Sequence, residues 1–396
     1  MRFRLQPTPA QEEALLEHCA HARYVWNLAC EQHLHWRPGR ASAPGYVEQS
    51  RQLTEARRKF AWLAAGSQTV QQQALRDFAQ AMANFFSGTH QRPRWRKAGV
   101  HEGFRIVGRR GSQWDVRRLS RRVGEVRIPK VGWVRFRWSR QVPGVVKSFR
   151  VNRDLAGRWH VAFAVIPPPI DGPGIGELVG VDRGVAVSAA LSTGERLSVP
   201  GLRETEAKRL ERLQRRLARA RRGSRRRNRV KAAISRLMAR EVDRRRDWVE
   251  QTSTDLARRF DLIRVEDLKI KNMTRSAHGT IHAPGRNVRA KAGLNRAIHA
   301  AGWGRLVKRL QDKAESRVEK VDPAYTSQTC NACGHCAAEN RESQAVFRCR
   351  ACGHADHADV NAAKNIAAGR AVTARGALQP LGGALNREPQ PVPSST

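Results

Sequence analysis

The chain has 396 residues, with 74 lysines and arginines against 35 aspartates and glutamates, a formal net charge of +39. Single hydrophobic cores stop growing at about 250 to 300 residues, so this length predicts more than one domain. Charge of one sign on this scale favours a polyanionic partner, nucleic acid first, over an anionic membrane, because the longest apolar runs fall far short of the roughly 20 residues of a spanning helix. No secretory signal is visible, so we expect an intracellular protein without a membrane partner.

The first hundred residues are predicted to be mostly helical. Thr8 as N-cap, Pro9 at the first helical position and Gln11 in a capping box begin one helix. A second helix fills "SQTVQQQALRDFAQAMANFFSG" and ends at Gly88. Its apolar stripe at helical spacing is Val70, Leu75, Phe78, Met82 and Phe85.

Strand patterns begin near residue 124. In "GEVRIPKVGWVRFRW", Val134, Phe136 and Trp138 alternate with arginines, which predicts a half-buried strand with a basic open face. A further hairpin follows and ends at the linker "PPPIDGPGIG". The segment "ELVGVDRGVAVSAALSTGERLSV" then predicts two or three adjacent strands.

A long basic helical hairpin is predicted after these strands, with a break at Gly223. Its two apolar seams are Leu210, Leu213 and Leu217, and Val230, Ile234 and Leu237. No acid lies between Arg212 and Arg240, which favours a phosphate-facing surface over a merely solvated one. Next come a buried strand in "FDLIRVEDL", a loop rich in Gly, His and Asn, and one helix over "RAIHAAGWGRLVKRLQDKAE".

Four cysteines have the spacing of a zinc site. Two C-x-x-C knuckles stand fifteen residues apart, formed by Cys330, Cys333, Cys349 and Cys352. Four thiolates fill a tetrahedral zinc and leave no open position, so the predicted metal is structural. His335 and Cys336 are alternative ligands that break the symmetric spacing, and Cys19 and Cys30 are expected to be buried apolar residues.

Several acids are candidate ligands for Mg²⁺, which prefers oxygen. Asp182 interrupts an apolar strand, and Glu266 ends another with Asp267 beside it. Asp359 opens the last helix, where it could equally be an ordinary N-cap, and Asp356 competes for the same role. Two or three such carboxylates holding two metal ions would stabilise the attacking and leaving oxygens of phosphodiester hydrolysis.

The chain resembles a known family in four motifs taken together. They are "GVDRGV", "RVEDLKIKNM", "YTSQTCNACGH" and "FRCRACGHADHADVNAAKNI", in this order. They are similar to those of the TnpB proteins of IS200/IS605- and IS607-type insertion sequences, relatives of the Cas12 CRISPR nucleases. Weaker matches extend the resemblance over nearly the whole chain up to about residue 370.

The resemblance implies a multidomain α+β fold. It would comprise a β-barrel wedge domain (1–10 and 124–170) with a helical recognition domain (11–123), followed by a RuvC-like, RNase H-type α/β nuclease domain (175–325) that includes the basic hairpin (201–260). A zinc-ribbon insertion that binds target nucleic acid (326–356), a last RuvC segment (357–375) and a disordered tail (376–396) would complete the chain.

The resemblance also implies an activity, that of a prokaryotic, cytoplasmic RNA-guided DNA endonuclease. Asp182, Glu266 and Asp359 would be its catalytic Mg²⁺ ligands, although the second acid that the family often has near the last aspartate is His357 here. A guide RNA from the transposon end would pair with double-stranded target DNA beside a short adjacent motif, near the helix that contains Gln68. The alternatives are a nuclease-dead repressor and a compact Cas12 effector; with only three tyrosines, a covalent tyrosine transposase has few candidates.

Overall fold

The computed structural model of the chain describes residues 1–35, 42–108, 110–144 and 146–369. The chain forms two compact units, Met1–Pro167 with Leu202–Arg244, and Pro168–Gly201 with Arg245–Thr396. Within the described ranges, no helix is both long and apolar enough to cross a membrane. The predicted tail at 376–396 and the end of the predicted last nuclease segment, 370–375, lie outside the described residues.

Two helices of the first unit, α1 and α4, were predicted from their sequences, and α2 and α3 were not. Helix α1 (Pro9–Leu34) has the predicted capping box. The backbone N–H of Gln11 donates to Thr8 Oγ1 at 3.3 Å, and the side-chain Oε1 of Gln11 accepts from the backbone N–H of Thr8 at 3.1 Å. Helices α2 (Tyr46–Lys59), α3 (Ala61–Ala65) and α4 (Gln68–Phe86) follow. The predicted stripe of α4 is buried except for Phe85, which is partly buried, and Gly88 follows with a φ of +71°.

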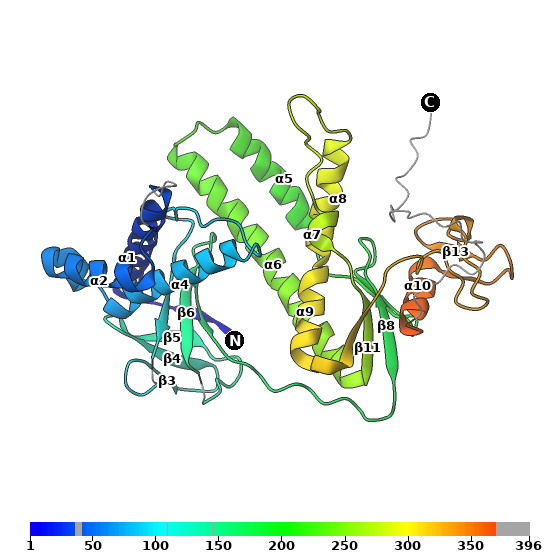
Figure 1. Cartoon of the computed structure of the whole chain (residues 1–396), viewed down its shortest axis with the longest axis horizontal. Helices are drawn as coiled ribbons and strands as arrows, with labels where there is room; N and C mark the ends of the chain where they lie inside the picture. Colours follow the sequence, from blue (N-terminus) through cyan, green and yellow to red (C-terminus); the bar gives the residue numbers. More distant parts are fainter. Residues whose placement is uncertain (36–41, 109, 145, 370–396) are drawn as a thin grey trace. The chain divides into compact units, whose positions relative to one another are not determined.

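A seven-stranded antiparallel sheet completes the core of the first unit (Figure 1). Its strands are β1 (Arg2–Gln6), β2 (Gly103–Val107), β3 (Asp115–Arg118), β4 (Val123–Ile128), β5 (Gly132–Arg137), β6 (Ser148–Arg153) and β7 (Trp159–Phe163), in the order β2-β6-β7-β1-β5-β4-β3. Val134 and Phe136 are fully buried, as their alternation with arginines predicts. Among the described residues β2 and β3 are the sheet's edges, so closure into a barrel stays a prediction.

The expectation of a helical segment over 11–123 is wrong from Gly103 onward. Strands β2 and β3 lie in that range and belong to the sheet. The reason is long-range pairing, because β2 is stabilised by hydrogen bonds to β6, about 45 residues later in the chain, which no local pattern reveals.

The basic hairpin forms as predicted, with helices α5 (Glu204–Arg219) and α6 (Arg225–Arg259) on either side of Gly223 at φ +81°. Leu213, Val230 and Leu237 of its apolar seams are buried. The hairpin was expected within the nuclease domain, but Leu202–Arg244 groups with the first unit. An ion pair of 2.6 Å between Arg158, which precedes β7, and Asp243 contributes to this association.

The second unit contains a mixed five-stranded sheet. Its strands are β8 (Leu178–Asp182), β9 (Ala189–Leu191), β10 (Arg196–Leu197), β11 (Leu262–Glu266) and β12 (Val318–Val321), in the order β10-β9-β8-β11-β12. β8, β11 and β12 run parallel to one another, whereas β9 and β10 are antiparallel additions. In Figure 1, β8 and β11 lie side by side at the centre of this sheet.

The helix predicted after the Gly-rich loop is in fact two helices. After the short α7 (Ile270–Met273), α8 (Val288–Ala301) begins inside the predicted loop, and α9 (Trp303–Ala314) follows it directly. Gly302 separates them because its φ of +73° is left-handed, a conformation that interrupts a helix and that glycine adopts without strain. Trp303 then donates its indole N–H to the Gly184 carbonyl at 3.0 Å, which fixes α9 beside the end of β8.

The cysteine segment and the last helix are continuous. Two short 3₁₀ turns, Glu315–Arg317 and Ala338–Asn340, and the antiparallel pair β13 (Val346–Arg348) and β14 (Ala355–His357) lead directly into α10 (Ala358–Ala367). Helix α10 packs against β8 of the five-stranded sheet.

Gly180 permits this close packing. A Cβ at Gly180 would lie 2.0 Å from the Ala363 carbonyl oxygen and 2.4 Å from the Ala367 nitrogen, both backbone atoms that cannot rotate away. We predict that Gly180→Ala lowers the free energy of unfolding by about 1 to 3 kcal/mol through overpacking. Thermal unfolding measures this, with Gly293→Ala in α8 as the control: a Cβ there meets open space, so no destabilisation is expected. Equal stability of wild type and Gly180→Ala would contradict the prediction.

Candidate active site

Two of the candidate acids lie at the ends of neighbouring parallel strands. β8 and β11 pair in register with Val181 opposite Val265, so the next residues, Asp182 and Glu266, stand side by side where both strands end. Glu266 also accepts a hydrogen bond from the Thr326 hydroxyl at 3.2 Å. Strand pairing, which the separate motifs do not contain, therefore brings these two carboxylates together.

The third acid comes from α10. Asp359 lies in the first turn of this helix and is buried, with 8% of its surface exposed. It is not the N-cap: His357 holds that position, and its Nδ1 accepts the Asp359 N–H at 3.3 Å. Asp359 Oδ2 would lie 3.8 Å from a Cβ built on Gly184, two residues beyond Asp182, so its carboxylate faces the end of β8.

Two of the acids act electrostatically on the third. Burial, followed by the negative charges of Glu266 and Asp359, raises the pKa of Asp182 well above its ordinary value, and Arg341 opposes this shift. Buried carboxylates that share a site disfavour each other's ionised form. The cluster therefore has the charge that a bound cation would compensate.

The competing acids have other partners. Asp356 accepts from the Lys364 ammonium at 2.7 Å and from the His357 N–H at 2.7 Å. Burial alone would raise the pKa of Asp356, but Lys364 and this backbone hydrogen bond outweigh it and lower the pKa. Asp267 is paired with Lys269, which lowers its pKa. The acids whose charges act on Asp182 are thus Glu266 and Asp359, and not Asp356 or Asp267.

Two arginines beside the acids were missed by sequence reasoning. Arg341, from the cysteine segment, donates to Asp359 Oδ1 at 3.0 Å. Arg183 is buried and donates to the backbone carbonyl of Glu266. A signal existed for Arg183, because an arginine directly after an aspartate in an apolar run needs a partner. None existed for Arg341, which lies 18 residues from Asp359.

The four cysteines converge as their spacing predicts. The group is Cys330, Cys333, Cys349 and Cys352. Its sulfur atoms all lie within 4.8 Å of one another, with Cys330 Sγ 3.7 Å from Cys352 Sγ and Cys333 Sγ 3.5 Å from Cys349 Sγ. His335 and Cys336 are not members of this group. Four thiols at these separations form the donor set of a closed tetrahedral zinc site.

The two knuckles repeat the same backbone turn. The Gly334 N–H donates to the Cys330 carbonyl at 2.9 Å, and the Gly353 N–H donates to the Cys349 carbonyl at 3.0 Å. Both glycines have a positive φ, +79° and +72°, which a residue with a side chain adopts only with strain. Each turn is therefore determined locally, and strand pairing between β13 and β14 brings residues near the second knuckle into register.

Comparisons with known proteins find matches along nearly the whole chain. Family models match residues 1–37 ("Helix-turn-helix domain"), 166–277 (OrfB of IS605, "Probable transposase") and 303–366 ("Cas12f1-like, TNB domain"). The "Putative RNA-guided DNA endonuclease InsQ" of Escherichia coli (strain K12) is 37% identical over 398 residues, covering 98% of this chain and 96% of that protein. The chain belongs to the IS605 OrfB, or TnpB, family.

This TnpB-family chain is also similar to a second curated relative and to a solved structure. The "Putative RNA-guided DNA endonuclease" of Streptomyces pristinaespiralis is 30% identical over 385 residues, covering 95% of this chain and 90% of that protein. A solved Cas12f1–sgRNA–target DNA complex has the same fold, with a TM-score of 0.54 at 16% identity over 90% of this chain and 82% of the Cas12f1 chain. In this TnpB-family protein the segment matched as helix-turn-helix is strand β1 followed by the long helix α1 over its described residues.

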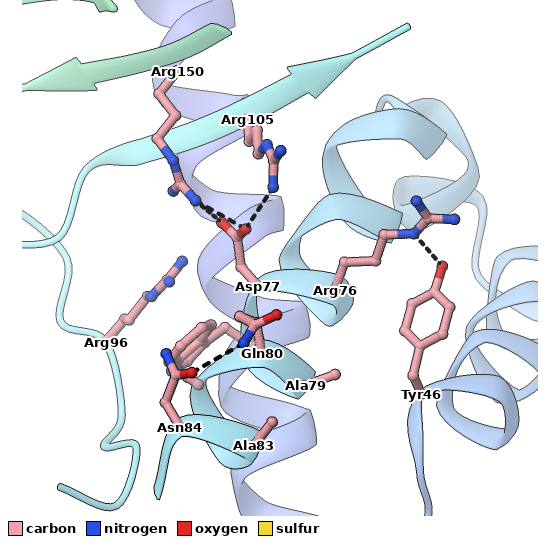
Figure 2. A pocket seen from close by; sticks show the side chains of 12 residues that line it. Tyr46, Arg76, Asp77, Ala79, Gln80, Ala83, Asn84, Arg96, Arg105 and Arg150 are labelled. Carbon is pink, nitrogen blue, oxygen red and sulfur yellow. Dashed lines mark hydrogen bonds and ion pairs between the residues drawn. The ribbon is translucent and has the colours of Figure 1, made fainter. Parts of the chain in front are cut away.

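The first unit of this TnpB-family chain holds a basic pocket of about 720 Å³ (Figure 2). Its charged lining is Arg76, Arg96, Arg105, Arg150 and Asp77. Asp77 pairs with Arg150 at 2.8 Å and with Arg105 at 3.4 Å, as the dashed lines in Figure 2 show. Four cations against one anion leave the pocket with a net positive charge, suited to an anionic ligand.

Arg96 is a largely buried cation in the lining of this pocket. Its guanidinium carbon lies 3.6 Å from the centroid of the Trp26 ring, a cation–π contact. Among the described residues its side chain has no carboxylate within ion-pair distance, and burial lowers the pKa of Arg96 to about 10. An anion bound here would restore the solvation that this guanidinium has lost.

Proposed function

We propose that the chain is an RNA-guided DNA endonuclease that hydrolyses target DNA at Asp182, Glu266 and Asp359. The observation that supports this most is that the charges of Glu266 on β11 and Asp359 on α10 both act on Asp182 of β8, in a chain of net charge +39. The two relatives that match over nearly the whole chain are both named as putative RNA-guided DNA endonucleases, which supports DNA as the substrate and RNA as the guide. We further propose that the mixed sheet and α10 form a RuvC-like, RNase H-type domain, and that the protein acts in a prokaryotic cytoplasm.

The three acids fit Mg²⁺. All are carboxylates, the ligand type that this hard cation prefers, and burial together with the negative charges of Glu266 and Asp359 raises the pKa of Asp182. A bound cation would compensate those negative charges. Bound between them, Mg²⁺ would stabilise negative charge on the attacking and leaving oxygens of the phosphodiester. Thr326 and Arg183 orient Glu266 through its side chain and its backbone carbonyl, and Arg341 orients Asp359.

Zinc is proposed as the resident of the four-cysteine site, where it would be purely structural. The four sulfur ligands leave no coordination position for substrate or water. We propose that this segment forms the zinc-ribbon insertion that contacts target nucleic acid.

The test of the proposed function starts from the RNA that copurifies with the protein. Sequencing that RNA identifies the guide, and a plasmid library that matches its variable end reports cleavage and the adjacent motif. Guide-dependent, Mg²⁺-dependent cutting is expected. Guide-dependent binding without cutting would favour the nuclease-dead repressor, and cutting that ignores the guide would refute the proposal. A CRISPR array next to the gene would distinguish a compact Cas12 effector.

The basic pocket gives a prediction about nucleic-acid binding. If a backbone phosphate occupies it, Arg96→Gln should weaken binding and reduce the slope of log K against log salt by about 1. Titrations of guide RNA and of duplex DNA at several salt concentrations measure the slope for each nucleic acid. Arg58→Gln removes the same charge from an exposed position outside the pocket lining, so it serves as the control. Equal slopes for the two variants would exclude a phosphate at Arg96.

A further inference from the structure

Helix α10 carries two buried asparagines that belong to neither metal centre. Asn361 is fully buried and Asn365 is 2% exposed. They are four residues apart, so both point to one face of the helix, close to Asp359 in its first turn. Burying a carboxamide costs free energy unless it is hydrogen-bonded. The hydrogen-bond partners of the two asparagines therefore show which segment this face of the helix is fixed to.

Both asparagines form hydrogen bonds to the backbone next to the first cysteine, Cys330. Asn361 Nδ2 donates to the Thr329 carbonyl at 2.8 Å, and its Oδ1 accepts the Asn331 N–H at 3.0 Å. Asn365 Nδ2 donates to the Thr329 carbonyl at 2.7 Å and to the Thr326 carbonyl at 2.9 Å. Since residues 329 and 331 flank Cys330, helix α10 is bonded to the knuckle on both sides of a proposed zinc ligand.

The same two segments reach the carboxylates. Thr326, whose carbonyl Asn365 holds, donates its hydroxyl to Glu266 Oε1 at 3.2 Å. Arg341, which lies between the two knuckles, donates to Asp359 Oδ1 at 3.0 Å. Displacement of the cysteine segment would therefore move hydrogen-bond donors at two of the three acids.

We propose that Asn361 and Asn365 are positioning residues that couple the four-cysteine zinc module to the carboxylate centre. The module thereby sets the geometry of Glu266 and Asp359, in addition to any contact it makes with nucleic acid. The effect on cleavage, the catalytic part of this inference, rests on the proposed nuclease function. The effect of the zinc module on the order of α10, the mechanical part, does not. Zinc occupancy is expected to control the order of α10 in either case.

Hydrogen exchange of the zinc-loaded, full-length protein tests the mechanical part without any cleavage. In the wild type, removal of zinc should speed exchange in α10 (Ala358–Ala367). Asn361→Ala and Asn365→Ala should show fast exchange in α10 while zinc is still bound, as measured by elemental analysis. Unchanged protection of α10 in both variants, or in the zinc-free wild type, would overturn the proposal.

Asn340→Ala is the matched control. Asn340 is also fully buried, but it bonds within the module, donating to the Gln328 and His335 carbonyls at 3.0 and 3.1 Å and accepting from the Arg350 N–H at 2.9 Å. Its loss should speed zinc release to a chelator. A general loss of stability would speed zinc release in all three variants. The coupling instead predicts that the two α10 variants release zinc as slowly as the wild type does.

Cleavage assays test the catalytic part. The α10 variants should retain guide RNA and target binding, need more Mg²⁺ for half-maximal cutting, and cut about 10- to 100-fold more slowly at low Mg²⁺. Excess Mg²⁺ should restore part of the rate. If the wild type does not cut, the proposed function fails while the exchange result still decides the coupling; if the wild type cuts and the variants share its Mg²⁺ dependence, the coupling is wrong.

Discussion

Asp182→Asn should reduce guide-directed DNA cleavage on the order of a thousandfold or more and leave guide and target binding intact. The asparagine keeps the shape of the side chain but removes one charged oxygen ligand from the cluster at the ends of β8 and β11. Losing a group that acts as part of a catalytic unit typically removes most of the rate. Single-turnover cleavage of a matched plasmid measures the loss, and retained cutting would refute the assignment.

The same substitution should stabilise the Mg²⁺-free protein. Because the pKa of Asp182 is raised in the folded state, the folded protein binds this proton more tightly than the unfolded chain does. That contribution to stability is present at low pH and is lost as the pH rises through the folded pKa. At pH 8 without Mg²⁺, Asp182→Asn should therefore melt a few degrees above the wild type, and the difference should shrink toward pH 4.

A matched pair separates the two aspartates near the start of α10. Asp359→Asn should be as inactive as Asp182→Asn, whereas Asp356→Asn loses an ion pair with Lys364 and should retain most activity. This partly exposed ion pair is worth about 1 kcal/mol. Equal loss of cleavage in the Asp359 and Asp356 variants would contradict the assignment of Asp359, rather than Asp356, as the metal ligand.

Cys330→Ser should remove the zinc and with it most of the order of the last 40 described residues. Structural zinc contributes about 10 kcal/mol or more of apparent binding free energy in small modules, and much of this is folding free energy. Because α10 is bonded to residues on both sides of Cys330, we expect the melting temperature to fall by about 10 °C or more and cleavage to be lost.

Cys336→Ser is the control for zinc removal. Cys336 lies six residues from Cys330 and is half-buried, but it is outside the group of converging thiols. Its substitution should leave one zinc per chain and near-wild-type melting. Elemental analysis and thermal unfolding of both variants decide between the four-cysteine site and one that uses Cys336.

Local patterns were sufficient for the zinc module and for most helices. Each C-x-x-C knuckle closes within five residues through a hydrogen bond to a cysteine carbonyl, so spacing alone determines its geometry. The capping box at Thr8 and Gln11 is equally local. Strands β2 and β3 were missed because their stability comes from pairing with β6 and β4, which the local sequence does not contain.

The sequence by itself determined which acids could be catalytic and that nucleic acid is the expected partner, because residue type, motif order and net charge need no fold. Only the tertiary structure shows that Asp359 acts on Asp182 while Asp356 is paired with Lys364, since this depends on Gly180 letting α10 approach β8. It also brought Thr326, 60 residues from Glu266, to that carboxylate. Contacts across such separations depend on the packing of whole elements, and local sequence cannot encode them alone.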